Sequence, residues 1–355
     1  MEWLSKLYNY IKVKVTGEST TAQKTPAVAP KEPLPLASGA KKSVPNEITM
    51  VGNLSDEQIQ ANSERAKYIS VVKNPPHKVK SGESIDVIAG KYGVETRSLL
   101  ALNSLTSETA KKIKPGQSLQ IPPSRKVKNV KNLNDIAKSM GVSLDFIKKL
   151  KRVEDGSEFT ENKFHNTPYK DKNGVLTIGI GHVVKKGEPQ KLTNAQVCEL
   201  CAKDLLKMEE NLCTLLGGQK NYDKLPQSLK EALLDMTFNK GTAIIEKTEG
   251  LLYCLKAGKY EAAINKFTNN KSAKTGQEMS GLSKRRLFDI SVAVKMYNGK
   301  IPQSNINTAQ QVYNRGVQLL RMECRKSGTN FKHQLAGFNQ DVQSYLGGKI
   351  KLTKE

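Results

Sequence analysis

The sequence contains no uninterrupted run of about 18 apolar residues, which is the length expected of a membrane-spanning helix. Residues 1–11 also lack the basic start, apolar stretch and small-residue cleavage site of a secretion signal. We therefore expect no transmembrane segment. We also expect the chain to be made in the cytoplasm and to reach any outside substrate by a route other than its own signal.

Cysteine and histidine are scarce. The five cysteines are an odd number at scattered positions, which does not make a disulfide framework. Cys198, Cys201 and Cys213 could suggest a zinc knuckle, but Val197, Cys201 and Leu205 recur at helical spacing, so buried apolar positions explain them better. The four histidines lie far apart, which disfavours zinc amidase or peptidase chemistry. We expect no metal and no cofactor.

Aromatic residues make up only 6% of the chain, while basic residues outnumber acidic residues by 57 to 34 and give a formal charge of +23. This charge predicts an anionic partner. Proteins that grip nucleic acid usually interleave aromatic side chains with Arg and Lys, so the composition disfavours nucleic acid. A bacterial wall with phosphate-bearing polymers fits the charge equally well.

The N-terminal part of the chain, up to Pro76, divides into three segments before any compact unit. Residues 1–16 predict a short amphipathic helix whose apolar face, including Trp3 and Leu7, either docks on a partner or packs on the chain itself. Residues 17–48 are rich in Pro, Ala and Ser and predict a linker. Residues 49–76 predict a helical spacer, opened by Ser55 with Gln58 three residues later as a capping box.

Residues 77–123 predict a strand, two helices and a closing strand. The first helix begins at Ile85 and ends at Gly93, and the second ends at Asn103. The segment resembles the LysM wall-binding module over nearly its full length. The resemblance rests on Val-Lys-Ser-Gly-Glu-Ser-Ile (79–85), Ile-Ala-Gly-Lys-Tyr-Gly-Val (88–94), Leu-Asn (102–103) and Pro-Gly-Gln (115–117).

The LysM resemblance implies a βααβ fold that binds glycan containing N-acetylglucosamine in a shallow groove. The groove residues that it implies are Gly82, Glu83, Ser84 and Ile85 in one loop, and Asn103 and Leu105 in the other. A LysM fold can also serve as a structural adaptor in a larger assembly, and this alternative stays open.

A partial repeat of this unit follows over residues 124–144. The helix at 85–94 recurs downstream as the segment 133–142. The similarity between the two copies ends before the second copy reaches a closing strand. We infer that the second helix of the repeat, opened by Ser143, continues as the first helix of the next domain. The binder and that domain would then be joined rigidly.

Residues 145–301 carry the most informative motif, Tyr-Lys-Asp-Lys-Asn-Gly-Val-Leu-Thr-Ile-Gly-Ile-Gly-His at 169–182, after a glutamate-bearing helix at 150–156. The segments Phe-Asn-Lys-Gly (238–241) and Gly-Leu-Ser-Lys-Arg-Arg (281–286) follow in order. This domain resembles phage-type lysozymes, which are muramidases. The expected fold class is α+β and mainly helical, with a LysM module before a domain that has a small β-hairpin lobe and a helical lobe.

Glycoside cleavage needs one protonated carboxyl at the leaving oxygen and one carboxylate on the opposite face of the sugar. The resemblance assigns Glu154 as the acid, Asp171 as the carboxylate that positions or deprotonates water, and Thr177 as the hydroxyl that holds this water. The family has Glu directly before Gly, whereas here Asp155 intervenes. Asp155 or Glu158 could therefore hold the place of the acid.

Three further residues have predicted roles. The resemblance implies that Asn239 contacts the glycan, and Gly179 fits a close approach to a helix or to substrate. His182 is expected to be structural and paired with an acid. Residues 302–355 extend beyond the resemblance and predict one or two helices, with a partner surface as one possible use.

The resulting hypothesis is a peptidoglycan hydrolase that cleaves the β-1,4 bond between N-acetylmuramic acid and N-acetylglucosamine. The two ends of the chain suit an enzyme carried in a phage virion, as part of the tail, that is made in the bacterial host cytoplasm. Two alternatives remain: a late-lysis endolysin, and a non-catalytic component of a phage tail or baseplate whose folds serve for docking.

Overall fold

The computed structural model describes residues 63–155, 163–171, 174–272 and 275–354. The predicted helix at 1–16, the linker at 17–48 and half of the spacer at 49–76 lie outside these residues. The described half of the spacer, residues 63–76, includes the strand Ile69–Val72, so the spacer is not helical throughout as predicted. Within them the chain is mainly helical with small antiparallel sheets, which confirms the predicted fold class. None of the helices in the described ranges is both long enough and apolar enough to cross a membrane.

The LysM-like unit has the predicted order of elements. These are β2 (His77–Lys78), α3 (Ile85–Tyr92), α4 (Thr96–Leu102), a short α5 (Ser107–Ala110) and β3 (Ser118–Leu119). β2 pairs antiparallel with β3. The Ser84 hydroxyl caps α3, and Gly93 ends this helix in the left-handed conformation, as the sequence predicts. A small core that includes Ile88, Leu99 and Leu119 holds the unit together.

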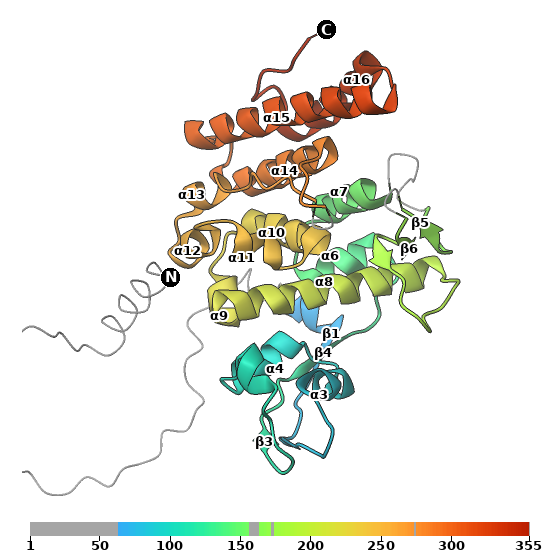
Figure 1. The fold of residues 1–355 in the computed structure, drawn as a ribbon, viewed down its shortest axis with the longest axis vertical. Helices are drawn as coiled ribbons and strands as arrows, with labels where there is room; N and C mark the ends of the chain where they lie inside the picture. The colour runs from blue at the N-terminus through green and yellow to red at the C-terminus, as the bar shows by residue number, and fades with distance from the viewer. Residues whose placement is uncertain (1–62, 156–162, 172–173, 273–274, 355) are drawn as a thin grey trace, which may run out of the picture. The chain divides into compact units, whose positions relative to one another are not determined.

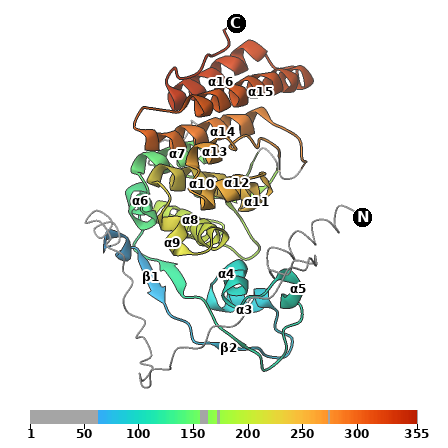
Figure 2. The ribbon, with the colours of Figure 1, turned by 90° about the vertical axis from the view of Figure 1, so that its left-hand side faces the viewer.

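The partial repeat forms a second unit whose missing strand comes from upstream. Its elements are β4 (Ser124–Val127), α6 (Leu133–Met140) and α7 (Leu144–Asp155). β1 (Ile69–Val72), which precedes the LysM-like unit, pairs antiparallel with β4 along its whole length (Figure 2). The LysM-like unit is therefore inserted between the two strands of a permuted second copy. The pairing by β1 gives β4 backbone hydrogen-bond partners along one edge.

The two copies have matching helix ends but different cores. Asn132 caps α6 as Ser84 caps α3, and Gly141 ends α6 with φ 62° where Gly93 ends α3 with φ 63°. However, Leu133, Ile136 and Phe146 of the second copy belong to the large core of the rest of the chain. Helix α7 runs without a break from the repeat to the predicted acid, which confirms the inferred shared helix.

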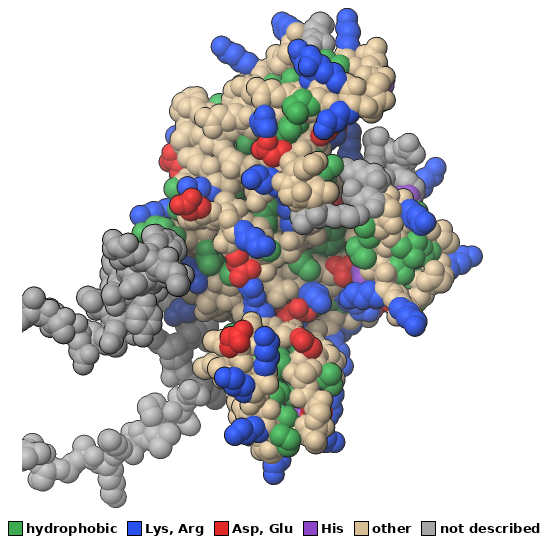
Figure 3. Space-filling view, viewed as in Figure 1, with side chains coloured by type: hydrophobic (Ala, Val, Ile, Leu, Met, Phe, Trp, Pro, Cys, Tyr) green, Lys and Arg blue, Asp and Glu red, His purple; other side chains and the backbone are tan. Residues whose placement is uncertain are grey.

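A three-stranded hairpin lobe follows α7. It consists of β5 (Tyr169–Lys170), β6 (Leu176–Ile178) and β7 (His182–Val183), with β6 in the middle. In β6, Thr177 and Ile178 are buried, while Leu176 at the start of the strand is 40% exposed. Leu176 and Val183 contribute to the exposed apolar surface of this lobe (Figure 3).

The helical lobe is built in layers that are visible in Figure 1. Its helices are α8 (Asn194–Leu216), α9 (Gln219–Asp223), α10 (Gln227–Lys240), α11 (Ala243–Lys247), α12 (Leu251–Lys256), α13 (Tyr260–Ile264) and α14 (Ser280–Ala293). Helix α10 packs between α8 and α14. Cys198, Cys201 and Cys213 are buried on α8, which confirms their interpretation as small core residues. Burial raises the pKa of Cys198 and Cys213 to about 12 and so disfavours the thiolate that zinc requires.

The C-terminal extension forms two helices, as predicted, and packs on the same chain. Helices α15 (Gln303–Ser327) and α16 (Phe331–Leu346) cover α14. Gly316 allows this close approach, because a Cβ atom there would lie 2.8 Å from the Phe338 ring and 3.0 Å from the Ser283 Cβ. The Met322 side chain remains 49% exposed. Whether this surface meets a partner stays a prediction.

Candidate active site

The last turn of α7 carries Glu154, whose carboxylate is held by a buried arginine of α14. Glu154 Oε1 lies 2.5 Å from Arg285 Nη1, and the two side chains are 17% and 8% exposed. Arg285 also donates two hydrogen bonds of 2.9 Å to the carboxylate of Asp235 on α10. One guanidinium therefore bridges two acids that belong to different helices and lie far apart in sequence.

The polar network continues inward from this bridge. Arg286 and Asp289 of α14 are fully buried and form an ion pair of 3.1 Å, and Arg286 donates to Asn239 Oδ1 at 3.4 Å. Burial raises the pKa of Asp289 well above its usual range. For Asp235, burial acts in the same direction, but the charge and hydrogen bonds of Arg285 prevail and lower the pKa. These ion pairs and hydrogen bonds therefore connect Glu154 on α7 with Asn239 on α10 through the two arginines of α14.

The hairpin lobe meets Glu154 at a glycine. Gly181, between β6 and β7, has φ +72°, and a Cβ atom built there would lie 2.6 Å from Glu154 Oε2 and 3.0 Å from Glu154 Cδ. The backbone at this position therefore lies directly against the carboxylate, and a larger residue would force the Glu154 side chain to shift. Since Thr177 is four residues earlier on the same hairpin, this contact sets the hairpin beside the end of α7.

Gly181→Ala is expected to destabilise the protein more than Gly187→Ala does. Both glycines have positive φ, so each substitution carries a backbone cost of about 1–2 kcal/mol, but a Cβ atom at Gly187 meets nothing within 4 Å. The overlap with Glu154 adds about 1–3 kcal/mol at Gly181 alone. Urea unfolding of the two variants measures the difference. Equal losses would contradict the close contact.

Asp171 closes the turn between β5 and β6. Its Oδ1 accepts a hydrogen bond of 2.7 Å from the backbone N–H of Val175, and its backbone N–H donates to the Val175 carbonyl at 2.9 Å. Thr177 lies opposite Tyr169 in the strand register and donates its hydroxyl hydrogen to the Val175 carbonyl at 3.1 Å. The structure therefore fixes the carboxylate and the hydroxyl on one hairpin lobe. Asp171 lies in the turn before β6, and the glycine that touches Glu154 lies in the turn after it.

His182 is held between two acids, which confirms its predicted structural role. Nδ1 lies 2.7 Å from Asp204 Oδ2, and Nε2 lies 3.1 Å from Glu188 Oε2. The hydrogen bond to Asp204 and the charges of both acids raise the pKa of His182, against the effect of burial. Asp204 belongs to α8, so this histidine fastens the hairpin lobe to the helical lobe.

The His182 contacts predict a pH dependence of stability. Because the folded pKa is raised, the contribution is complete below the ordinary histidine pKa of about 6.5 and is lost as pH rises through the folded value. Wild type should therefore lose stability relative to His182→Gln as pH is raised from about 6 to 9. Unfolding midpoints at several pH values measure this difference. The variant His333→Gln, at an exposed position on α16, should track wild type, and parallel curves for all three proteins would contradict the pairing.

In the LysM-like unit the predicted groove residues are tied into the fold. Ser84 Oγ accepts from the Val87 N–H at 3.3 Å. The Glu83 carboxylate accepts from the Lys80 N–H at 2.8 Å and lies 2.6 Å from His77 Nε2. These contacts fix the loop that follows β2 and so organise one wall of the predicted groove.

The second groove loop is pinned to the closing strand. The Asn103 amide donates to the carbonyls of Leu99 and Gln120 at 2.8 Å, and its oxygen accepts from the Gln120 N–H at 2.8 Å. Leu105 packs against the core of the unit, Ile85 is buried within it, and Gly82 has positive φ. Glycan contacts at these residues stay predictions.

For the remaining predicted positions, the structure shows packing contacts, while their contacts with sugar stay predictions. A Cβ atom at Gly179 would lie 3.0 Å from Val197 Cγ1 on α8, so the close approach to a helix is present, while a sugar contact stays a prediction. Asn239 is half-buried at the end of α10, with its oxygen directed to Arg286. The side chain of Asp155 and all of Glu158 lie outside the described residues.

Sequence patterns missed Asp235, although its setting offered a signal. The residue is the one acid within the apolar stretch Leu-Leu-Asp-Met at 233–236, and an acid in such a place is usually paired when it is buried. The two arginines of the 281–286 motif pair with buried acids, Arg285 with Asp235 and Arg286 with Asp289.

Two family models match the chain. The phage lysozyme model matches residues 160–288, and the LysM domain model matches residues 77–122. The first match includes Asp171, Thr177 and Arg285 but begins after Glu154. No significant match to a curated protein is found.

Several solved structures are similar to parts of the chain. The active form of the phage P1 endolysin Lyz aligns with a TM-score of 0.39 at 14% identity, covering 49% of this chain and 99% of that one. The muramidase domain of SpmX from Asticaccaulis excentricus gives 0.34 at 21% identity, covering 43% and 97%. A mutant of the phage P22 lysozyme gives 0.31 at 26% identity, covering 41% and 92%.

Proposed function

Because the chain carries a phage lysozyme domain and a LysM domain, as a peptidoglycan hydrolase does, we propose that it is an N-acetylmuramidase. It would cleave the β-1,4 bond between N-acetylmuramic acid and N-acetylglucosamine. The observation that carries the proposal is the contact of the Glu154 carboxylate with Gly181, which belongs to the same hairpin lobe as Asp171 and Thr177.

In the proposed mechanism the two carboxyls act on opposite faces of one sugar linkage. Glu154 gives its proton to the glycosidic oxygen as the bond to the sugar carbon breaks. Thr177 holds a water molecule against that carbon, and Asp171 takes the proton of this water as the new bond to oxygen forms. The Val175 N–H fixes the position of the Asp171 carboxylate by a hydrogen bond of 2.7 Å.

One observation favours a second assignment for the acid. The Arg285 guanidinium lies 2.5 Å from Glu154 Oε1 and fixes the position of this carboxylate. A group held in this way suits an anchor as well as a proton donor. Asp155 directly follows Glu154 and stands immediately before a glycine, at the position where the family has its glutamate. In this alternative Asp155 donates the proton and Glu154 positions the end of α7 through Arg285.

The LysM domain would hold the enzyme on its polymer. Glu95, at the start of α4 in this domain, lies 3.0 Å from Lys207 of α8, and Ser98 lies 2.9 Å from Thr214 of the same helix. A binder fixed beside the enzyme raises the local substrate concentration into roughly the millimolar range.

Basic side chains are spread over the visible face and are not gathered in one stripe, and this distribution suits an anionic wall (Figure 3). A LysM fold that serves only as an adaptor would leave wall binding unchanged when the groove is altered.

Product chemistry tests the proposed reaction. Purified peptidoglycan incubated with the full chain should lose turbidity and gain reducing sugar ends, identified as N-acetylmuramic acid by mass spectrometry after borohydride reduction. New amino groups without new reducing ends would indicate an amidase or peptidase and would contradict the proposal. A protein that binds the wall without releasing any product would instead support the non-catalytic alternative.

We further propose that the enzyme travels in a phage virion, associated with the tail, with residues 1–16 and 302–355 as contacts to other tail proteins. The sequence pattern of the segments 1–16 and 17–48 and the added helices α15 and α16 support this proposal. Purified particles should contain the chain after high-salt washing. Its absence from particles, together with its accumulation late in infection, would identify a lysis enzyme instead.

A further inference from the structure

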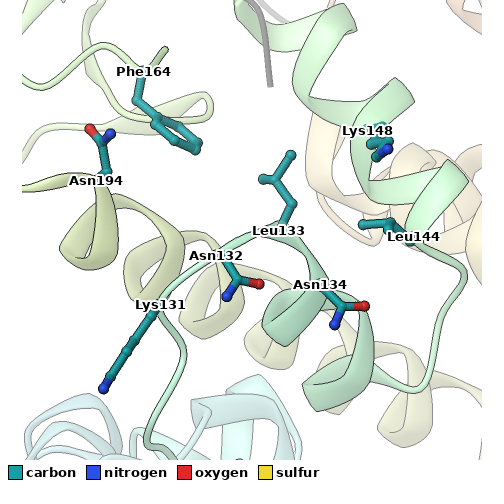
Figure 4. A pocket seen from close by; sticks show the side chains of 8 residues that line it. All are labelled: Lys131, Asn132, Leu133, Asn134, Leu144, Lys148, Phe164 and Asn194. Carbon is teal, nitrogen blue, oxygen red and sulfur yellow. The ribbon is translucent and has the colours of Figure 1, made fainter. Parts of the chain in front are cut away.

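A pocket of about 340 Å3 lies where α6, α7 and α8 begin. Figure 4 shows Phe164 and Asn194 on one side, Leu133 at the centre, and Leu144 and Lys148 of α7 opposite. Its volume is at the lower end of the range for small-molecule sites, about 300–1,000 Å3, which suits a ligand the size of one sugar.

The pocket lies apart from the proposed cleavage site. Lys148 precedes Glu154 by six residues on α7, so the two are separated by about 9 Å along the helix axis and by about 120° around it. The hairpin glycine that touches Glu154 takes no part in the lining. A ligand in this pocket would therefore bind without entering the reaction.

The lining combines two cations and several amides with apolar faces. Lys131 and Lys148 carry the positive charge, and none of the residues that line the pocket is acidic. The side chains of Asn132, Asn134 and Asn194 add carboxamide groups, which can both donate and accept. Amides beside apolar walls match the N-acetyl group and C–H faces of an amino sugar, and the lysines add a preference for an anion.

The position of the pocket in the internal repeat gives independent support. In the register of the repeat, residues 131–133 take the places of Glu83, Ser84 and Ile85, the loop predicted to contact glycan in the LysM unit. In the second copy the acid Glu83 is replaced by Lys131, which reverses the charge at this point. Phe164 and Asn194, from outside the repeat, complete the pocket.

The loop that carries Lys131 is held in place before any ligand arrives. Asp135 Oδ2 accepts from the Lys131 N–H at 2.9 Å, and the Asp135 N–H donates to Asn132 Oδ1 at 3.0 Å. Tyr68 donates to the other oxygen of Asp135 at 3.1 Å. A preformed loop saves the free energy of ordering it on binding.

From the repeat and the chemistry of this lining, we propose that the pocket binds an N-acetylhexosamine unit that carries a carboxylate, as a second wall contact outside the cleavage site. The proposal rests on the proposed function for the nature of the polymer. It distinguishes two contacts: the LysM groove, which takes neutral amino sugar, and this pocket, which takes the acidic one.

Monosaccharide titration tests the pocket without any bond to cleave, so the result does not depend on hydrolysis. The full chain is titrated with N-acetylmuramic acid and with N-acetylglucosamine, and NMR shifts of amide signals near the pocket give the dissociation constants. The acidic sugar should bind there at least about tenfold more tightly, as expected for charge-assisted hydrogen bonds. The double variant Lys131→Gln/Lys148→Gln should remove this advantage.

The control variant Lys149→Gln makes the same kind of charge change one residue away on α7, where Lys149 pairs with Asp145 at 3.0 Å. It should leave the affinity at the pocket unchanged. Equal binding of the two sugars, or an equal loss in the control, would overturn the proposal. Full competition by inorganic phosphate at equal concentration would mark a general anion site and would also overturn it. Absence of wall clearing with these titrations intact would contradict the proposed function alone.

Discussion

Glu154→Gln is expected to lower the rate of peptidoglycan clearing by at least about a hundredfold, because a glutamine cannot give a proton to the leaving oxygen. Binding to the insoluble wall should persist, since the LysM domain is untouched. The matched control is Glu199→Gln on α8, where the acid pairs with Lys203 at 2.7 Å on the surface. Turbidity assays and wall pull-down of the three proteins give both quantities.

The same assay decides between the two candidates for the acid. If Glu154 donates the proton, Asp155→Asn should retain measurable clearing while Glu154→Gln does not. Wild-type clearing by Glu154→Gln would contradict the assignment. A loss of clearing confined to Asp155→Asn would place the proton on Asp155 and leave Glu154 as the partner of Arg285. Loss in neither variant would direct attention to Glu158.

Arg285→Met is expected to lower the free energy of unfolding by about 3–5 kcal/mol, the usual cost of removing one partner from a buried ion pair. Methionine fills much of the same volume but leaves Asp235, which is fully buried, and Glu154 without their shared cation. Urea unfolding measures the loss.

Two further variants test whether the effect of Arg285→Met comes from the loss of its buried ion pairs. Arg315→Met removes an ion pair with Glu278 at the surface and should cost less than about 1 kcal/mol. Combining Arg285→Met with Asp235→Asn should recover part of the loss, because the second change removes an uncompensated buried charge. A loss below about 1 kcal/mol for Arg285→Met alone would contradict the view that this arginine holds the site together.

Local patterns predicted much of the fold. The Ser84 cap, the glycine that ends α3 and the Asn103 that ends α4 are short-range features, and the structure has all three. The continuation of the repeat into α7 could also be predicted, because the register of the repeat matches Leu99 with Ile147 and Leu102 with Leu150.

The sequence could not show where the second strand of the repeat comes from. Ile69 pairs with Val127 across the inserted LysM-like unit, and strand pairing between distant segments leaves little local signal. The same limit applies to the site. The bridge from Glu154 through Arg285 to Asp235 joins three helices, so it depends on tertiary packing that no single motif encodes.

The identity of the acid illustrates a different limit. The motif places two neighbouring carboxyls before Gly156, and a shift of one residue along a helix turns a side chain by about 100°. The structure shows that Glu154 points to Arg285 and to the hairpin glycine. The structure therefore places Glu154 in the ion-pair network around Arg285. The sequence alone shows only that Glu154 lies close to the motif along the chain.

A crystal structure of the Glu154→Gln variant with a bound peptidoglycan oligosaccharide tests the central claim most directly. The claim is that one sugar linkage lies between the end of α7 and the hairpin that carries Asp171. The account predicts that the glycosidic oxygen lies about 3 Å from residue 154 and that the Asp171 carboxylate faces the opposite side of the same linkage. An oligosaccharide bound with both side chains on one face, or bound away from α7, would contradict it.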